Sequence, residues 1–187
     1  MTKIQLRNTY KTLRSQLSED KIDALSITIA NQLLTLDIWG FNFYHVFLSI
    51  ESQKEINTDF ILNILSGKDK NIVVSKSNFE TNTLSNYLLT DATTLKLNVY
   101  NIPEPIDGIE IPNDKIDLVF VPLLAFDLKG HRIGYGKGFY DNFLAACNPE
   151  TIKIGLSFFE AETEIEDTYE GDIMLDYCVT PDKIYQF

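Results

Sequence analysis

A glycine-rich segment carries the residues of this chain that could most directly do chemistry. Gly134, Gly136 and Gly138 alternate, and the segment also holds Arg132 and Lys137. Glycine lets a backbone take left-handed angles and approach a ligand closely, with its amides turned inward as an anion nest. The two basic side chains would supply charge. The segment predicts a phosphate site, although a glycine-rich hairpin or bulge is about equally common for a bare Gly-x-Gly-x-Gly pattern.

Two common nucleotide-binding motifs do not fit this segment. A Walker A loop ends in Gly-Lys-Ser/Thr, whereas Gly138 follows Lys137 here. The dinucleotide fingerprint Gly-x-Gly-x-x-Gly needs one more residue before its last glycine. What remains is the string Arg-x-Gly-x-Gly-Lys-Gly-Phe-Tyr-Asp, which runs from Arg132 to Asp141. A phosphate site here would therefore be of a different kind.

The block from Asp117 through Asp141 resembles the signature of the 5-formyltetrahydrofolate cyclo-ligase family, whose members are also called methenyltetrahydrofolate synthetases. Further similarities extend over most of the chain, at Lys3 to Arg7, Lys54 to Thr58, Pro103 to Pro105, Asp172, and Asp176 to Thr180. Four positions differ from residues common in the family, and none removes a group with obvious chemistry: Lys54, Lys137, Phe139 and Asn142.

The resemblance implies a reaction and its co-substrates. The enzyme would convert 5-formyltetrahydrofolate, which can be polyglutamylated, into 5,10-methenyltetrahydrofolate, and it would use ATP and Mg²⁺. ATP would phosphorylate the formyl oxygen, N10 would attack the activated carbon, and phosphate would leave. Such a step needs positioning and charge neutralisation more than a protein nucleophile. Arg132 and Lys137 would then be the catalytic residues.

The resemblance also implies roles for individual residues. ATP would be bound by the start of the chain and by the glycine segment, through Lys3, Arg7, Arg132, Gly134, Tyr135, Gly136, Lys137, Gly138, Phe139 and Tyr140. Folate would contact Ile50, Glu55 and Tyr140. Mg²⁺ prefers oxygen ligands and is usually held by one or two carboxylates, here Asp141 and Asp172.

Plainer interpretations of the same residues remain open without the resemblance. Lys3 and Arg7 could belong to a solvated basic face, and Glu55 to an exposed loop. Asp141 could favour the start of a helix through the macrodipole. Aromatic residues after a turn, such as Tyr140, are more often core than ligand-stacking.

The sequence pattern alone predicts no site role for two further groups of polar residues. The segment 160–176 is rich in acids and lacks Lys and Arg, which is typical of an exposed stretch, so Asp172 is singled out only by the resemblance. His45 lies in a predicted strand and His131 beside the glycine segment. Neither has a triad or metal-ligand partner at a recognisable spacing, and we predict no catalytic role for them.

Helices are predicted where apolar residues recur at helical spacing. Leu6, Tyr10, Leu13 and Leu17 would form the apolar face of a first helix, with Thr2 and Gln5 as its capping box. Ser18 would cap a second helix, Thr58 would begin a short one that Gly67 ends, and Gly138 would lead into one through Ala146. Strands are predicted at 43–50, 71–75, 95–100, 118–122, 153–158 and 177–179, with a proline-rich acidic loop at 102–114.

This alternation of strands and helices predicts an α/β layered domain with a largely parallel sheet flanked by helices, and one domain over residues 1–187. The resemblance implies a ribose 5-phosphate isomerase/CoA transferase-like fold. Ligands in such sheets gather at the carboxyl ends of strands, where the turn after Val121 would lie.

Composition limits the partners and the compartment. A net charge of -11 argues against a nucleic-acid surface. No apolar run approaches the roughly 20 residues that span a bilayer, and no signal-peptide region is seen, so we expect no membrane partner and a cytoplasmic protein. The chain has two isolated cysteines, Cys147 and Cys178, which we expect to be buried free thiols. We expect a monomer or a weak homodimer.

The sequence is also compatible with two other functional classes. The first is another phosphate-binding enzyme of the same fold, a sugar-phosphate isomerase or a CoA transferase, which would not hydrolyse ATP. The second is a protein that binds nucleotide or folate without turning it over. Release of ADP would separate the first from a cyclo-ligase, and stoichiometric binding without product would indicate the second.

Overall fold

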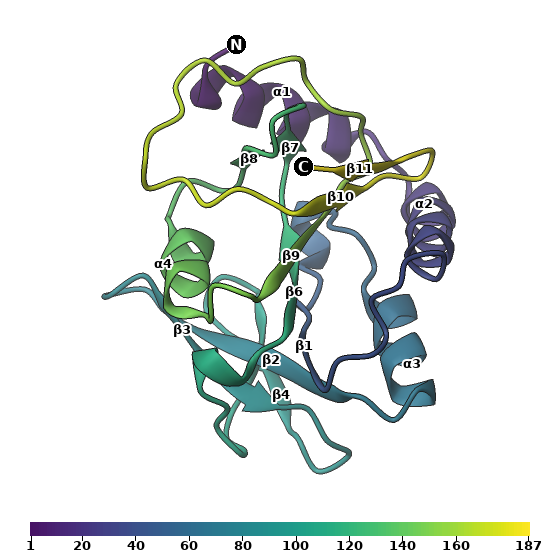
Figure 1. Ribbon diagram of the computed structural model, residues 1–187, viewed down its shortest axis with the longest axis vertical. Helices are drawn as coiled ribbons and strands as arrows, with labels where there is room; N and C mark the ends of the chain where they lie inside the picture. The colour runs from purple at the N-terminus through teal and green to yellow at the C-terminus, as the bar shows by residue number, and fades with distance from the viewer.

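A seven-stranded, mostly parallel sheet forms the centre of the computed structural model, which describes residues 1–187 (Figure 1). The strand order is β11-β10-β9-β6-β1-β2-β3. The central strands β10, β9, β6, β1 and β2 pair in parallel, and β11 and β3 pair antiparallel at the two edges. The bounds are β1 Phe43–His45, β2 Asn71–Asn78, β3 Thr83–Leu88, β6 Leu118–Pro122, β9 Ile152–Leu156, β10 Tyr177–Val179 and β11 Ile184–Gln186.

Helices cover both faces of this sheet (Figure 1). Helices α2 (Glu19–Leu33) and α3 (Asp59–Gly67) lie on one face, and α4 (Phe139–Ala146) lies on the other. Helix α1 (Lys3–Ser15) packs instead on a two-stranded hairpin of β7 (Ala125–Phe126) and β8 (Arg132–Ile133). No helix combines the length and the apolar character needed to span a membrane.

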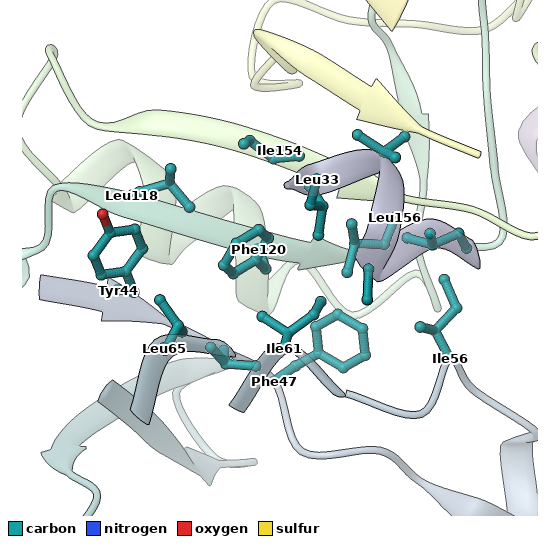
Figure 2. Close-up of a cluster of buried hydrophobic side chains, with 14 of the residues drawn as sticks. Leu33, Tyr44, Phe47, Ile56, Ile61, Leu65, Leu118, Phe120, Ile154 and Leu156 are labelled. Carbon is teal, nitrogen blue, oxygen red and sulfur yellow. The ribbon is translucent and has the colours of Figure 1, made fainter. Parts of the chain in front are cut away.

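Strand β6 shows how the sequence builds the two core layers. All of its residues from Leu118 to Val121 are buried, as expected for a central parallel strand. Leu118 and Phe120 face the cluster that contains α2 and α3, whereas Val119 and Val121 face the cluster that contains α4. Figure 2 shows the first of these clusters around Phe120. Truncating such a buried aromatic side chain typically costs about 3–5 kcal/mol of stability.

The predicted helix starts are confirmed at α1 and α2. The capping box of Thr2 and Gln5 is present in α1, and the Ser18 side chain accepts from the Lys21 amide at the start of α2. The buried face of α1 differs from the predicted one, because Leu13 is 40% exposed while Arg14 is buried. Residues 6, 10 and 14 therefore make that face, and a charged residue occupies an apolar position of the pattern.

Several predicted strands are too long. The strand predicted at 43–50 ends at His45, because side chains there take the place of a sheet partner: the Ile50 amide donates to Glu55 Oε2 at 2.8 Å, and the Ser49 hydroxyl donates to the Ile56 carbonyl at 2.6 Å. The strand predicted at 95–100 ends at Leu97, where Asn98 Oδ1 accepts from the Tyr100 amide at 2.8 Å and forms a turn.

Other elements were not predicted at all. They are the edge strands β3 and β11, the hairpin β7/β8, and β5 (Pro103–Pro105), which pairs with β4 (Leu95–Leu97) inside the segment expected to be a loop. These strands are two to six residues long and are made mainly by pairing with a neighbour. The two cysteines are free and buried, as predicted.

Candidate active site

A cavity of about 430 Å³ lies where α1, the segment between β8 and α4, and the carboxyl ends of the sheet's central strands meet, since His45 ends β1 and Pro122 ends β6. Every residue predicted for the site lines it: Lys3, Arg7, Ile50, Glu55, Arg132, Gly134, Tyr135, Gly136, Lys137, Gly138, Phe139, Tyr140, Asp141 and Asp172. The structure therefore brings together residues from both ends of the chain. Their individual roles remain predictions.

The glycine segment connects β8 to α4. The sequence pattern predicts this segment as the turn after Val121, and that prediction is wrong: the β7/β8 hairpin lies between β6 and the glycine segment, with Phe126 opposite Arg132. Gly136 and Gly138 have positive φ angles of 92° and 72°, and Gly138 is the N-terminal cap of α4. Gly134 does not have a positive φ angle. Two of the three glycines thus serve the left-handed backbone that was predicted.

Arg7 joins α1 to this segment. Its Nε donates to the Gly134 carbonyl at 3.0 Å. A Cβ atom added at Gly136 would lie 3.2 Å from the Arg7 guanidinium carbon, so the absence of a side chain at Gly136 allows the close approach. The remaining guanidinium nitrogens of Arg7 make no hydrogen bond to the protein. They are available to an anion in the cavity.

Lys137 is held by aromatic rings and has no carboxylate partner. Its ammonium lies 4.9 Å from the ring centroids of both Phe79 and Tyr100. These rings also contact each other, with centroids 4.3 Å apart, and Phe79 lies 5.2 Å from Phe139. Cation–π contacts of this kind orient a charge without neutralising it. Sequence patterns did not point to Phe79 or Tyr100, since both lie outside the resembling segments.

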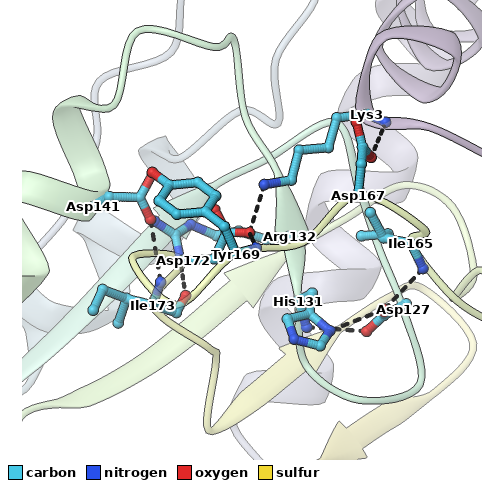
Figure 3. A network of polar contacts seen from close by, with 10 residues as sticks. All are labelled: Lys3, Asp127, His131, Arg132, Asp141, Ile165, Asp167, Tyr169, Asp172 and Ile173. Carbon is cyan, nitrogen blue, oxygen red and sulfur yellow. Dashed lines mark hydrogen bonds and ion pairs between the residues drawn. The ribbon is translucent and has the colours of Figure 1, made fainter.

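Two ion pairs link the acidic candidates to the basic ones (Figure 3). Lys3 Nζ lies 2.5 Å from Asp172 Oδ2, and Arg132 Nη2 lies 2.7 Å from Asp141 Oδ1. Asp141 Oδ1 also accepts from the amide of Ile173, the residue after Asp172, at 3.3 Å. Arg132 donates through its other nitrogen to the Ile173 carbonyl. Asp141 and Asp172, far apart in sequence, therefore meet at one wall of the cavity.

Glu55 is buried, which corrects the plainer interpretation of an exposed loop residue. Its Oε1 accepts from the Tyr135 hydroxyl at 2.6 Å, and Arg14 donates to that same hydroxyl. Burial raises the pKa of the Glu55 carboxyl, while the hydrogen bonds from Tyr135 and Ile50 and the charge of Arg14 lower it. Arg14 was not predicted for this network, because its position in the apolar spacing of α1 gave no sign of a buried charge.

His45 also lines the cavity, although no role was predicted for it. The side chain is fully buried, and its Nε2 lies 2.6 Å from the Ser75 hydroxyl on β2. Burial lowers the pKa of this imidazole to about 3, so it is neutral at ordinary pH. A single histidine in an apolar strand is not part of a recognisable sequence motif. Its partner Ser75 lies on another strand, so the sequence alone could not identify the pair.

Comparison with known proteins places this site in a family. The model of the 5-formyltetrahydrofolate cyclo-ligase family matches residues 1–181. The chain belongs to this family. The match includes the glycine segment, α1 and the acidic stretch with Asp172, so the resemblance predicted from the sequence is confirmed.

Other members of the cyclo-ligase family resemble the chain over almost its whole length. A protein of Schizosaccharomyces pombe described as a probable 5-formyltetrahydrofolate cyclo-ligase is 31% identical, with 98% of this chain and 97% of that protein aligned. The 5-formyltetrahydrofolate cyclo-ligase of Haemophilus influenzae is 28% identical over 91% of this chain and 93% of its own.

Solved structures of the family have the same fold. The NMR structure of Aquifex aeolicus 5,10-methenyltetrahydrofolate synthetase aligns with a TM-score of 0.84 at 27% identity, covering 100% of this chain and 93% of that one. A 5,10-methenyltetrahydrofolate synthetase from Mycoplasma pneumoniae aligns with a TM-score of 0.77 at 20% identity, over 97% of this chain and 99% of the other. The predicted α/β fold with a mostly parallel, helix-flanked sheet is thereby confirmed.

Proposed function

We propose that this chain converts 5-formyltetrahydrofolate to 5,10-methenyltetrahydrofolate with consumption of ATP. The observation that carries the proposal is the gathering of five basic side chains around one cavity in an acidic member of the cyclo-ligase family: Lys3, Arg7, Lys11, Arg132 and Lys137. Such a concentration of positive charge in a chain with a net charge of -11 suits a polyphosphate.

The chemistry explains why a phosphate donor is needed. Closing the ring requires N10 to bond to the formyl carbon while that carbon loses its oxygen, and oxide or hydroxide is a poor leaving group. Transfer of the γ-phosphoryl group of ATP to the formyl oxygen makes this oxygen part of a phosphate. N10 then attacks the carbon and loses its proton, phosphate leaves with the electron pair of the C–O bond, and ADP is the other product.

The basic residues fit the first of these steps. Phosphoryl transfer is catalysed mainly by positioning and by charges that face the transferring group. Arg7 and Lys137 have donors that no protein acceptor occupies, and the amides around Gly136 and Gly138 lead into the N-terminus of α4, a favourable place for an anion. We assign Lys3 and Arg7 to ATP binding and Arg132 and Lys137 to catalysis, with the segment from Gly134 to Tyr140 around the nucleotide.

The carboxylates fit a Mg²⁺ ion that arrives with the nucleotide. Asp141 and Asp172 each use one oxygen toward protein donors, and the other oxygen takes no hydrogen bond from the protein. No cluster of three or more acidic, histidine or cysteine side chains exists that would hold a metal alone. This suits Mg²⁺, which usually takes one or two carboxylates together with phosphate and water. The ion would neutralise charge on the phosphate oxygens.

Folate would occupy the part of the cavity near the buried carboxylate. Glu55, Ile50 and Tyr140 line it, and the carboxylate is held rigidly by Tyr135 and by the Ile50 amide. We further propose that residues 1–187 act as one catalytic domain, because the cavity lining extends from Lys3 to Asp172. We also propose that the fold is of the ribose 5-phosphate isomerase/CoA transferase-like kind.

A direct assay tests the proposed function. The purified protein is incubated with 5-formyltetrahydrofolate, ATP and Mg²⁺, and the near-ultraviolet absorbance of the methenyl product is followed together with ADP. We expect the two products in equal amounts. ADP without methenyl product, or binding of both substrates without turnover, would contradict the proposal and indicate a different phosphate-using or a purely binding protein.

A further inference from the structure

His45 is placed by the sheet at the floor of the cavity. It is the last residue of β1, between β2 and β6, and it pairs with Val73 of β2. Its ring centroid lies 4.8 Å from that of Phe143 and 6.0 Å from that of Tyr140, both on α4. The side chain is fully buried among these rings while still lining the cavity. Its orientation is therefore determined by the core and not by a ligand.

A chain of hydrogen bonds determines which ring nitrogen of His45 carries the proton. Asn86 Nδ2 donates to Asn113 Oδ1 at 2.5 Å, so the other amide atom, Asn86 Oδ1, faces Ser75. The Ser75 hydroxyl donates its only hydrogen to that oxygen at 2.8 Å. Ser75 must then accept from His45 at 2.6 Å, which places the proton of the neutral imidazole on Nε2. Nδ1 is left with a lone pair.

That lone pair has no partner in the protein. Nδ1 of His45 is buried and makes no hydrogen bond. Buried polar atoms are satisfied in the great majority of cases, so an acceptor without a partner on a side chain that lines a cavity points to a donor that arrives with a ligand. The acceptor also excludes some ligands, because phosphate and carboxylate oxygens carry lone pairs of their own and would repel it.

We infer that His45 is a specificity-determining residue whose Nδ1 accepts a hydrogen bond from an N–H group of the reduced pterin ring. This inference rests on the proposed function. The phosphates of ATP are drawn to the basic side chains of α1 and of the glycine segment, so the neutral acceptor remains for the other substrate. A tetrahydropterin offers ring N–H groups and an amino group, and its planar pyrimidine half suits the aromatic and apolar side chains that line the cavity together with His45, which include Phe47, Leu84 and Pro122.

Replacing His45 by asparagine or by glutamine tests the two ring nitrogens separately. The amide of His45→Asn lies near the position of Nδ1 and can still present an acceptor there, whereas the amide of His45→Gln lies near the position of Nε2 and reaches only toward Ser75. We expect His45→Gln to weaken binding of 5-formyltetrahydrofolate about tenfold, the effect of one lost hydrogen bond, and His45→Asn to weaken it less. Affinity for ATP and kcat should change little in either variant.

The measurements are calorimetric titrations with each substrate alone, steady-state rates, and thermal unfolding of both variants. Wild-type turnover combined with normal folate affinity in His45→Gln would overturn this inference and leave the proposed function intact. Equal weakening of ATP binding would overturn it as well. A wild type that neither binds nor converts 5-formyltetrahydrofolate would overturn the proposed function, and this inference with it.

Nitrogen-15 NMR of the histidines tests the tautomer without any enzymatic readout. The chain has only two histidines, and the His45→Gln variant assigns the signals. We expect the Nε2-protonated neutral form of His45 in the free protein, and an upfield shift of the Nδ1 signal when 5-formyltetrahydrofolate is added. Protonation at Nδ1 in the free protein, or an Nδ1 signal unmoved by saturating folate, would overturn the inference.

Discussion

The cavity has two walls that are built in different ways. The phosphate wall, formed by Lys3, Arg7, Arg132 and Lys137, consists of charged side chains on α1 and on the segment around the β8–α4 connection. The sheet wall, formed by Glu55, Tyr135, His45 and Ser75, consists of groups linked by hydrogen bonds across strands and loops. In the phosphate wall, Arg7 and Lys137 have no acidic partner and keep donors free for a ligand, while Lys3 and Arg132 are paired with carboxylates at the cavity. The sheet wall uses most of its polar atoms in hydrogen bonds within the protein.

This difference indicates that the two walls have different roles. Free positive charge acts on a charge that develops during reaction, so substitutions in the phosphate wall should change rates and ATP dependence while the protein stays folded. Buried, mutually satisfied groups hold one geometry, so substitutions in the sheet wall should change stability or affinity for an uncharged ring.

The largest effect is expected at Lys137. Replacing it by alanine should lower turnover about 10²-fold or more, corresponding to loss of roughly 3 kcal/mol of transition-state stabilisation, because its ammonium lines the cavity and is oriented by aromatic rings without an ion partner. Circular dichroism should stay native, since the side chain is exposed. Lys21→Ala, on the exposed face of α2, is the matched control. Near-normal turnover of Lys137→Ala at saturating ATP would contradict the assignment.

The next largest effect is a stability change in the sheet wall. Tyr135→Phe removes the hydroxyl that donates to Glu55 and accepts from Arg14, leaving two buried charged groups with fewer partners. We expect a loss of about 1–3 kcal/mol in the free energy of unfolding. Tyr169→Phe is the matched control, since Tyr169 is 64% exposed and its hydroxyl makes no hydrogen bond. Denaturant unfolding measures both, and equal midpoints for the two variants would remove the structural role of the Tyr135 hydroxyl.

The two walls also differ in how far the sequence could predict them. The capping box of α1 is formed by two residues that are three positions apart in the sequence. The glycine segment has its basic residues and its glycines within ten residues. Local sequence patterns therefore predicted both features. His45 and Ser75 are 30 residues apart, and Glu55 and Tyr135 are 80 apart. Nothing local distinguishes such residues from ordinary core or loop positions, because their partners are supplied by strand pairing.

The same reason explains the errors in the fold. Helices α2 and α4 were predicted because their spacing and their starts are local signals. The short strands β3, β7 and β8 depend on pairing with β2 or with each other, and were not predicted. The predicted strands were too long where backbone amides donate to the side chains of Glu55 or Asn98 and do not pair with another strand.

Two substitutions of Arg7 test its role in ATP binding. Arg7→Ala should raise the KM for ATP about tenfold and leave the KM for 5-formyltetrahydrofolate nearly unchanged, as expected when ground-state binding of one substrate is lost. Arg7→Lys keeps the positive charge but loses the guanidinium group, whose several N–H donors can reach the Gly134 carbonyl and an anion at the same time. Its effect on the KM for ATP should therefore be smaller than that of Arg7→Ala. Initial rates with each substrate varied in turn give both constants. Similar increases for the two substrates would place Arg7 outside a nucleotide-specific role.

The smallest effect concerns the metal dependence of Asp141 and Asp172. Asparagine keeps the size of each side chain but removes a hard anionic ligand, so Asp141→Asn and Asp172→Asn should each need a several-fold higher Mg²⁺ concentration for half-maximal product formation. The double variant should be less than additively worse if both oxygens serve one ion. Each substitution also breaks an ion pair, to Arg132 or to Lys3, but that loss does not depend on Mg²⁺. A Mg²⁺ titration of the wild type, both single variants and the double variant therefore separates the two effects. Lower rates with an unchanged Mg²⁺ concentration at half-maximal rate would contradict the proposed metal site. These carboxylates would then only hold the basic side chains in place, and the phosphate wall would act without a metal bound to them.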